Sequence, residues 1–470
     1  MEPKNQQLRF SSFTKIFFNG DVVAYYHSLL GEVCFMSLDY HQLFQKAFSQ
    51  KHETIYFLES VTKEQLNILD FLVNNTFLVP ETFSEYQQIC DTRDRILNFP
   101  SLDIMYLLLT DSCNLCCKYC FLESPDAVYK NLRKPMGDMT LLTACKAVDV
   151  FFDLTRKYSS NNRNKFIQFY GGEPLINFSV LRGVTEYIQK KNMEFNEILH
   201  LVLITNATLV TDEIAKFLAD NKIAVGVSLD GPRDIHDAYR MRKGIVGGTY
   251  NVVMENIKRL RDAGVQVGIS CTLTPLVMDH YEELISFLVS DVGVQDGFSF
   301  NILHYAPEVL CDEIYFEKVA NGLIYSFNLL REKGIYEEKI MRRVQSYVSK
   351  TISYSDCGAT GNQIVVAPNG DVGVCQDFLK SGQYFYDNVF NDLLDPFQNE
   401  IFLEWRKRSP LFMKECFDCP SLSLCGGGCP ASAEIQFGNK WCIDTRICPY
   451  TKKILEWLIW DQFNSFLHAK

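Results

Sequence analysis

The sequence predicts an α/β protein whose central unit is a parallel sheet. Between residues of about 100 and 335, β-prone runs alternate with helical segments, and such alternation implies parallel strands joined by crossover helices. The six strand candidates are Ile104–Leu109, Phe166–Tyr170, Leu201–Thr205, Ile223–Leu229, Val265–Thr272 and Phe298–Leu303. Helix candidates between them include Leu141–Leu154, Tyr250–Ala263 and Tyr281–Val289.

Residues 1–95 form the first predicted unit. Asn19-Gly20 separates two β-prone runs, and this dipeptide indicates a hairpin because a type I′ turn needs positive φ at both positions. We expect a helix at Asp39–Phe48 and another after Thr62, because Thr62 and Gln65 have capping-box spacing. A hairpin followed by short helices resembles a small winged-helix module, and the alternative is a plain structural lid on the central unit.

Composition limits the class of protein. A chain of 470 residues is expected to fold as two or three domains, and the net charge of −11 disfavours a nucleic-acid partner. No apolar run approaches the roughly 20 residues of a membrane-spanning helix, and the N-terminus has no signal-peptide core. We therefore expect a cytoplasmic protein in which the 17 cysteines serve metal or redox chemistry instead of disulfides.

A short cysteine run directly after the first predicted strand is the most informative motif. Cys113, Cys117 and Cys120 have the spacing C-x3-C-x2-C. Three thiolates can hold three irons of a four-iron cluster, which leaves the fourth iron open to a small chelating molecule. The alternative is two CxxC zinc knuckles, but this would place the adjacent residues Cys116 and Cys117 on one small ion. We therefore predict that Cys116 is not a ligand.

The run resembles the signature of radical S-adenosylmethionine (SAM) enzymes. The resemblance implies that SAM binds the open iron of a [4Fe–4S] cluster through its amino and carboxylate groups, and that reductive cleavage releases a 5′-deoxyadenosyl radical. It also places the aromatic residue Tyr119 near the adenine. The six strand–helix units resemble the family's partial (βα)6 TIM-like barrel, in which the chemistry occurs at the C-terminal ends of the strands.

The segment after the second predicted strand resembles a SAM-binding motif of the same family. It reads Gly171-Gly172-Glu173-Pro174, and in relatives this motif binds the methionine amino group. Glycines let a backbone approach a ligand closely, and Glu173 can accept hydrogen bonds from an amine. The alternative is a glycine turn followed by a helix start.

Two further motifs follow the third and fourth predicted strands. Asn206 lies in a run that resembles the family's TNGT-like motif, although Ala207 replaces the usual glycine; its alternative is a turn-capping role. Ser228 and Arg240 occupy the positions that contact the methionine carboxylate in relatives, and the alternative for Arg240 is a surface salt bridge. We predict a structural role for His236.

The C-terminal region contains a second set of cysteines. Cys357, Gly370 and Cys375 form C-x12-G-x4-C, and four later cysteines have the spacing C-x2-C-x5-C-x3-C. Cys448 then follows after 18 residues. The pattern resembles the SPASM domain, which holds two auxiliary [4Fe–4S] clusters, with one residue inserted before the last cysteine. The alternative is a pair of structural zinc ions.

The SPASM resemblance assigns these cysteines to two clusters. The first would be bound by Cys357, Cys375 and Cys429. The second would be bound by Cys416, Cys419, Cys425 and Cys448. Cys442 is the candidate fourth ligand of the first cluster; without it, that cluster has an open iron for a substrate cysteine. The predicted domains are a leader-recognition module (1–95), the radical SAM barrel (96–340), the SPASM domain (341–450) and a terminal helix (451–470).

Within the family, SPASM domains imply modification of peptides or proteins. We favour a maturase that installs a crosslink, a cysteine thioether of the sactipeptide or ranthipeptide type, in a ribosomally made precursor peptide with a leader. The resemblance also implies a low-potential electron donor of the flavodoxin or ferredoxin type. Alternatives are a peptide epimerase, an anaerobic sulfatase-maturating enzyme that forms formylglycine, and a non-enzymatic iron–sulfur electron carrier.

One residue bears on the sulfatase alternative. Sulfatase maturases carry an aspartate directly after the second SPASM cysteine, whereas here Gln376 follows Cys375 and Asp377 comes one residue later. Neighbouring residues of an extended segment point to opposite sides. We therefore expect Asp377 to be a poor substitute, which lowers the sulfatase alternative without removing it.

Overall fold

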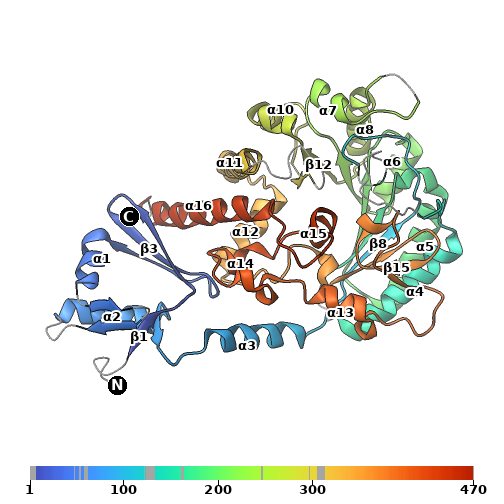
Figure 1. The fold of residues 1–470 in the computed structure, drawn as a ribbon. Coiled ribbons are helices and arrows are strands. Elements are labelled where there is room, and N and C mark those ends of the chain that lie inside the picture. Colours follow the sequence, from blue (N-terminus) through green and yellow to red (C-terminus); the bar gives the residue numbers. More distant parts are fainter. Residues whose placement is uncertain are drawn as a thin grey trace.

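The computed structural model describes residues 7–46, 48–51, 54–57, 62–120, 122, 133–159, 163–244, 247–295, 297–303 and 313–468. An N-terminal unit lies at one end of the molecule and a partial barrel lies at the other. The C-terminal region occupies the space between them (Figure 1).

Six parallel strands form the barrel sheet, as predicted. In the order of the chain and of the sheet they are β8 (Ile104–Leu108), β9 (Lys165–Tyr170), β10 (Leu199–Thr205), β11 (Ala224–Ser228), β12 (Val267–Leu273) and β13 (Phe298–Ile302). Every neighbouring pair is parallel. The C-terminal ends of all six strands therefore meet at one edge, which is where ligands bind in such folds.

Helices connect these strands. They are α4 (Leu141–Tyr158), α5 (Phe178–Phe195), α6 (Asp212–Asp220), α7 (Arg233–Tyr239), α8 (Tyr250–Asp262), α9 (Pro275–Asp279), α10 (Tyr281–Ser290) and α11 (Glu313–Leu330). Threonine side chains cap three of them: Thr140 accepts from the N–H of Thr143, and Thr211 and Thr274 do the same for α6 and α9. A threonine at this position satisfies a donor that the first helical turn leaves unpaired.

The sheet continues beyond the barrel into the C-terminal region, which the sequence did not predict. β14 (Gln363–Val366) pairs in parallel with β8, and β15 (Asp371–Gly373) and β16 (Phe385–Asn388) follow in antiparallel order. The turn between β14 and β15 contains Gly370, the glycine of the C-x12-G-x4-C pattern, at φ +88°. The cysteine-rich region therefore shares a nine-stranded sheet with the barrel.

The N-terminal unit contains two antiparallel sheets. One has β2 (Thr14–Asn19), β3 (Val22–His27) and β4 (Val33–Ser37). The other has β5 (Phe48–Lys51), β6 (Thr54–Phe57), β1 (Leu8–Phe10) and β7 (Leu78–Pro80), in sheet order. Its helices are α1 (Leu38–Gln45), α2 (Lys63–Asn74) and α3 (Glu85–Leu97).

Two local predictions for this unit can be compared with the structure. The capping box of Thr62 and Gln65 is present at the start of α2. The hairpin is also present, but its turn differs from the prediction, because Asn19 still pairs with Val22. The two-residue loop is Gly20-Asp21 with positive φ at Gly20 alone, as in a type II′ turn.

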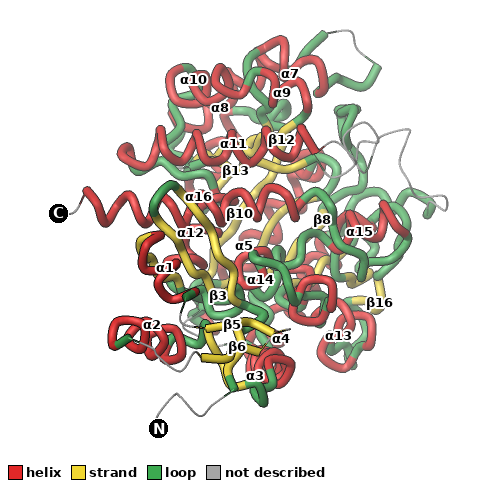
Figure 2. Tube along the Cα trace, turned by 60° about the vertical axis from the view of Figure 1, so that its left-hand side comes forward, coloured by secondary structure: helices red, strands yellow, loops and turns green. Residues whose placement is uncertain are grey.

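The remaining helices join the C-terminal region to both other parts. They are α12 (Glu338–Val348), α13 (Glu400–Arg406), α14 (Leu422–Cys425), α15 (Pro430–Phe437) and α16 (Ile447–His468). Figure 2 shows α16 beside α11 of the barrel. The other end of α16 reaches the N-terminal unit, where Phe35 lies 5.2 Å from Phe463 between ring centroids. The N–H of Ser423 donates to the carbonyl of Ser28 at 2.9 Å.

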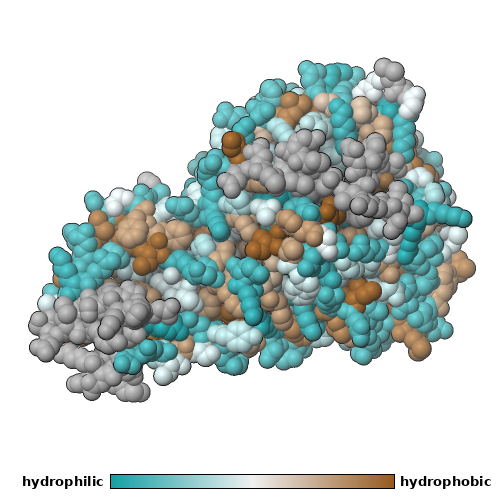
Figure 3. Space-filling model, viewed as in Figure 1, coloured by the Kyte–Doolittle hydropathy of each residue, from teal (hydrophilic) through white to brown (hydrophobic). Residues whose placement is uncertain are grey.

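Hydrophilic residues cover most of the described surface on the face drawn in Figure 3. Large exposed hydrophobic side chains are scattered along the chain, as at Phe99, Met193 and Leu393. None of the described helices combines the length and apolar character needed to cross a bilayer.

Candidate active site

A cavity of about 700 Å³ opens inside the partial barrel. All six barrel strands line it, through Tyr106, Tyr170, Thr205, Ser228, Thr272 and Asn301. The last residues of β9, β10 and β11 are among them, so the cavity reaches the edge where catalytic groups of barrel enzymes lie. Its size falls within the range of about 300–1,000 Å³ that is typical of ligand sites.

Three of the four clustered cysteines face this cavity. Cys113, Cys117 and Cys120 line it, whereas the thiol of Cys116 lies 3.7 Å from the carbonyls of Met241 and Arg242. This is the arrangement expected if Cys116 is not a ligand. The N–H of Cys116 also donates to the Met241 carbonyl at 2.9 Å, which fixes the loop against the segment after α7.

The three thiols suit a cationic group. Burial, with a smaller contribution from the neighbouring cysteines, raises the pKa of Cys113 to about 11 and that of Cys117 to about 12. Ionised together in this cavity, the thiolates would repel one another, so a positively charged cluster would be needed to hold them. Among the described residues, no group of three or more His, Cys, Asp or Glu side chains is arranged around a single metal ion.

The glycine pair packs against the cysteine loop. A Cβ atom on Gly171, which has φ +137°, would lie 2.3 Å from the carbonyl oxygen of Thr110, and one on Gly172 would lie 2.1 Å from that of Ser112. The N–H of Gly172 donates to Thr110 at 3.0 Å. The glycines line the cavity, but the contact that excludes a side chain is with the chain before Cys113. We expected these glycines to make room for a ligand, but the structure shows that they mainly make room for the backbone of Thr110 and Ser112.

Glu173 is fully buried and ties two strand ends together. Its carboxylate accepts from the Thr205 hydroxyl at 2.7 Å, the Asn206 N–H at 2.8 Å and the Leu175 N–H at 3.1 Å. Burial raises its pKa to about 6, although these hydrogen bonds oppose the shift. A carboxylate has about four lone-pair sites, so one remains for a donor in the cavity. Pro174 begins the short helical turn that follows.

Asn206 links this strand end to the cysteine loop. Its Nδ2 donates to Asn114 Oδ1 at 2.9 Å and lies 3.9 Å from Cys113 Sγ. The next residue, Ala207, has φ +58°, a conformation that glycine adopts without strain. This explains why a glycine suits that position, and Asn256 holds the Ala207 carbonyl through a hydrogen bond of 2.7 Å.

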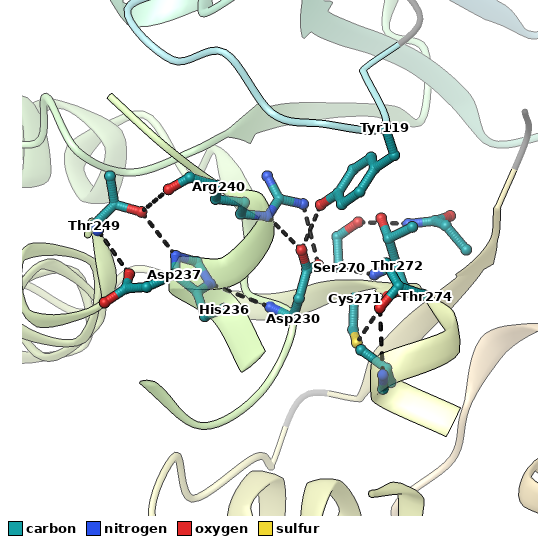
Figure 4. Close-up of polar contacts among 12 residues, drawn as sticks. Tyr119, Asp230, His236, Asp237, Arg240, Thr249, Ser270, Cys271, Thr272 and Thr274 are labelled. Carbon is teal, nitrogen blue, oxygen red and sulfur yellow. Dashed lines mark hydrogen bonds and ion pairs between the residues drawn. The ribbon is translucent and has the colours of Figure 1, made fainter. Parts of the chain in front are cut away.

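A buried aspartate that the sequence analysis did not single out organises the next strand ends (Figure 4). Asp230 is completely buried. It accepts from Arg240 Nε at 2.8 Å and Nη2 at 3.2 Å, and from the N–H of Thr272 at 2.9 Å. The hydroxyl of Tyr119 donates to the same carboxylate. The Arg240 guanidinium also lies over the Tyr119 ring, 5.4 Å from its centroid.

The Asp230 network shows that the alternative role considered for Arg240, a surface salt bridge, is wrong. The residue lines the cavity, but its ion pair is buried, with 10% of the Arg240 side chain exposed, so it is not a surface salt bridge. The signal for Asp230 was available in the sequence, because this acid stands between Ser228 and Arg240 in one motif. An arginine that must be buried needs a partner charge.

His236 belongs to the scaffold behind this network. Its Nδ1 accepts from the N–H of Asp230 at 3.3 Å, and its Nε2 is paired with the Thr249 hydroxyl at 2.9 Å. Burial lowers the pKa of His236 to about 4. The imidazole is therefore neutral near pH 7, in keeping with the structural role that we expected.

The C-terminal cysteines gather in two groups. In the first, the buried thiol of Cys375 lies within electrostatic reach of Cys429 and Cys357. β14 and β15 form an antiparallel hairpin, so the start of β14 lies beside the end of β15. Cys357 precedes β14 and Cys375 follows β15. The hairpin therefore brings these two residues together.

The second group combines four cysteines from separate turns and α16. Burial, together with the neighbouring Cys425, Cys419 and Cys416, raises the pKa of Cys448 to about 12. Burial and the neighbouring Cys425 and Cys419 also raise the pKa of Cys416 to about 12. These are the two sets that the SPASM resemblance assigned; their role as cluster ligands stays a prediction.

Buried arginines that no sequence motif indicated hold these cysteine loops in place. Arg408 donates to the carbonyls of Lys440, Gly427 and Cys442, at 3.0 Å for Gly427 and 2.8 Å for Cys442. Arg446 pairs with Asp444 at 2.7 Å. Asp444 in turn accepts from the N–H of Cys429 at 3.0 Å.

Asp377 lines the cavity together with Gln376, although we expected the two side chains to point to opposite sides. Residues Gln376–Phe378 form a 3₁₀ turn, and the side chains of both Gln376 and Asp377 line the cavity. The premise of an extended segment with alternating sides was therefore wrong. The cavity thus runs from the cysteine loop of the barrel towards the first C-terminal cysteine group.

Comparison with known proteins identifies the family of this site. Residues 107–288 match the family model described as the radical SAM superfamily. The chain is a radical SAM enzyme. The superfamily uses SAM and a [4Fe–4S] cluster, and the cavity described above offers three cysteines of the required spacing.

Relatives of this radical SAM enzyme include several maturases. It is 23% identical over 414 residues to the radical SAM cyclopropyl synthase TigE of Paramaledivibacter caminithermalis, covering 84% of this chain and 82% of TigE. It is 27% identical over 337 residues to the subtilosin biosynthesis protein AlbA of Bacillus subtilis, covering 68% of this chain and 65% of AlbA.

Two solved structures share the fold of this radical SAM enzyme. The anSMEcpe structure with bound AdoMet has a TM-score of 0.65 at 21% identity and covers 77% of this chain and 99% of that chain. Streptococcus suis SuiB bound to the precursor peptide SuiA has a TM-score of 0.53 at 15% identity and covers 94% of this chain and 99% of that chain.

Proposed function

We propose that this radical SAM enzyme is a peptide maturase that installs a crosslink, a cysteine thioether, in a ribosomally made precursor peptide. The observation that carries the proposal is the shared fold with SuiB, which was solved with its precursor peptide. That likeness covers 94% of this chain and so includes most of the N-terminal unit. The relatives TigE and AlbA, a cyclopropyl synthase and a subtilosin biosynthesis protein, support the same class of function.

In this proposal, Cys113, Cys117 and Cys120 hold the cluster to which SAM binds. Once bound, the cluster and SAM supply a 5′-deoxyadenosyl radical that removes a hydrogen atom from the peptide. The chain orients the cofactor: Glu173 offers its remaining lone pair to the methionine amine, and Arg240 and Ser228 face the carboxylate. Tyr119, Asn206, Gly171, Gly172 and Pro174 complete this pocket.

The Asp230 network has a defined part in this orientation. Because Asp230 holds Arg240 through two hydrogen bonds, the guanidinium is fixed before the ligand arrives. It keeps other N–H donors, since a guanidinium carries five. Such preorganisation lowers the entropy that binding must overcome.

The two C-terminal cysteine groups are proposed to hold auxiliary clusters, which brings the total to three [4Fe–4S] clusters. The first is bound by Cys357, Cys375 and Cys429, with Cys442 or a substrate thiol as its fourth ligand. The second is bound by Cys416, Cys419, Cys425 and Cys448. Thioether formation removes two hydrogens from the peptide: one leaves as the abstracted hydrogen atom and the other as the thiol proton, so one electron is left over. An auxiliary cluster held by these cysteines would supply the acceptor for that electron. A flavodoxin- or ferredoxin-type protein of the cytoplasm supplies the electron that starts turnover.

Anaerobic co-expression with the small peptides encoded beside the gene tests this proposal directly. Each thioether removes one pair of hydrogens from the peptide mass and makes one cysteine resistant to alkylation. An unchanged peptide mass with all cysteines alkylatable, in cells where SAM is still cleaved, would contradict the crosslinking proposal.

One observation favours a second candidate, sulfatase maturation. Asp377 lines the cavity two residues after Cys375, so a carboxylate is available near the place where sulfatase maturases carry theirs. Incubation with a sulfatase-derived cysteine peptide and SAM under reducing conditions would yield formylglycine, which a hydrazine probe detects. An unreacted peptide would remove this candidate.

A further inference from the structure

A second cavity lies outside the barrel, between α12 and the chain that follows it. Its volume is about 350 Å³. Every described side chain that lines it is polar or basic, and none of these is Asp or Glu. Sites for drug-like ligands are lined mainly by apolar groups. This composition instead suits a small and strongly polar ligand.

Two consecutive arginines give this cavity its charge. Arg342 and Arg343 both line it, and only 2% of the Arg343 side chain is exposed. Arg343 Nη2 donates to Asp356 Oδ1 at 2.6 Å and to the Tyr450 hydroxyl at 3.0 Å. Asp356 pairs with Arg343. The nearest carboxylate to Arg342 is Glu338, which is 60% exposed and 3.9 Å away, so this pair is weak and Arg342 can still attract an anion.

The Nε atoms of both arginines are buried and have no hydrogen-bond partner among the described residues. The nearest ion-pair oxygen to Arg342 Nε is Glu338 Oε1, at 3.9 Å, which is beyond hydrogen-bond distance. Both Nε atoms are closed off from solvent. A ligand in the cavity would therefore meet the outer N–H groups of Arg342, whose side chain is 37% exposed.

Hydroxyl groups from α12 and from the chain after it also line this cavity. Ser346 and Ser353 are 2.8 Å apart between Oγ atoms, and Ser355 and Thr351 also line the space. A hydroxyl can rotate to donate to a ligand oxygen. Arginines beside hydroxyl donors form the environment that proteins use for tetrahedral oxyanions.

We propose that this cavity binds a phosphate group. Arg342 supplies charge and its outer N–H donors. Ser355 and the hydroxyl hydrogen that the Ser346–Ser353 pair does not use internally donate to the remaining oxygens. The volume equals that of roughly a dozen water molecules at about 30 Å³ each. It therefore has room for the organic part of a small phosphorylated molecule as well as for free phosphate.

Calorimetric titration of the full-length chain under anaerobic conditions, at constant ionic strength, tests this site. The ligands are inorganic phosphate, ribose 5-phosphate and ribose. We expect both phosphates to bind and ribose not to bind. Tighter binding of ribose 5-phosphate would identify a phosphorylated metabolite as the source, and equal binding would identify free phosphate. No heat of binding with either phosphate would overturn the proposal.

Variants assign the binding to this cavity. Arg342→Gln should weaken phosphate binding at least tenfold, and the milder Ser355→Ala should weaken it several-fold. Arg331→Gln is the matched control, because Arg331 is a partly exposed arginine paired with Asp461 at 3.0 Å. Unchanged affinity in both Arg342→Gln and Ser355→Ala would overturn the proposal. The readout is binding alone, so it is independent of peptide maturation.

Discussion

The cysteines of the barrel and those of the C-terminal region are positioned by contacts of different range. Cys113, Cys117 and Cys120 lie within eight residues of one loop. Main-chain hydrogen bonds hold that loop against the segment after β9 and against the end of α7 and the segment that follows it. The C-terminal cysteines are spread over residues 357–448. They are brought together by a hairpin, buried arginines and α16.

The two regions should therefore respond differently to substitution. The barrel loop can lose one thiol without losing the contacts that place it, because those contacts come from the backbone. The C-terminal groups depend on side chains such as Arg408, which joins three segments. We therefore expect substitutions in the barrel loop to stop the reaction in a folded protein. Loss of a C-terminal anchor should instead loosen the region.

The largest effect is expected for Cys117→Ala. The variant should fold and should lose all detectable cleavage of SAM, because the two remaining cysteines cannot hold the cluster. Release of 5′-deoxyadenosine under reducing conditions, followed by chromatography, is the measurement. Cys116→Ala is the matched control and should cleave SAM at the normal rate, since that thiol faces Met241 and Arg242. Residual cleavage by a cluster-depleted Cys117→Ala protein would refute this role.

Cys375→Ala should separate the two regions functionally. We expect SAM cleavage to continue while peptide crosslinking falls below detection, because the barrel loop stays intact and the first C-terminal group is broken. Both products are measured in one reaction, as 5′-deoxyadenosine and as peptide mass. Normal crosslinking by this variant would remove the first C-terminal group from the chemistry.

A stability change of about 3 kcal/mol is expected for Arg408→Met. The substitution leaves three buried carbonyls without a donor, and each such loss costs about 1–3 kcal/mol, partly offset by local relaxation. Urea unfolding measures the change. Arg331→Met is the control, because its partly exposed ion pair contributes about 0–1 kcal/mol. Iron analysis should show less iron per chain while SAM cleavage persists, which would assign the lost iron to the C-terminal region. Equal stability of the two variants would contradict the comparison of the two regions.

Local patterns in the sequence predicted the barrel well. Each strand of the sheet is a short β-prone run between helices, so all six could be located before the structure was known. The capping box at Thr62 was predictable for the same reason, since its two hydrogen bonds join residues three positions apart.

Contacts between distant segments could not be read from such patterns. The pairing of β14 with β8 joins residues about 260 positions apart, and Gly171 is required by the backbone of Thr110 in the segment after β8. The charge balance of Arg240 depends on Asp230 being buried beside it. For Gln376 and Asp377, the error was the assumed backbone conformation, because a 3₁₀ turn follows Cys375.

The smallest expected effects come from two lysines in matched positions. Lys222 follows the last turn of α6 and Lys350 that of α12, with φ of +52° and +53°. This left-handed conformation costs a non-glycine residue about 1–2 kcal/mol, and glycine at the same position costs about 0.5–1 kcal/mol in unfolded-state entropy. Lys222→Gly should therefore stabilise the protein by roughly 0.5–1 kcal/mol.

Lys350→Gly should give the same backbone gain and lose one contact between units. Lys350 Nζ pairs with Glu32 of the N-terminal unit at 2.6 Å, and both side chains are partly exposed, so the pair contributes about 0–1 kcal/mol. The difference between the two variants in urea unfolding measures what this contact adds. A larger gain for Lys350→Gly than for Lys222→Gly would show that the ion pair does not hold the N-terminal unit in place. Cohesion would then come from the apolar contacts of Phe35 and the hydrogen bond of Ser28 to Ser423.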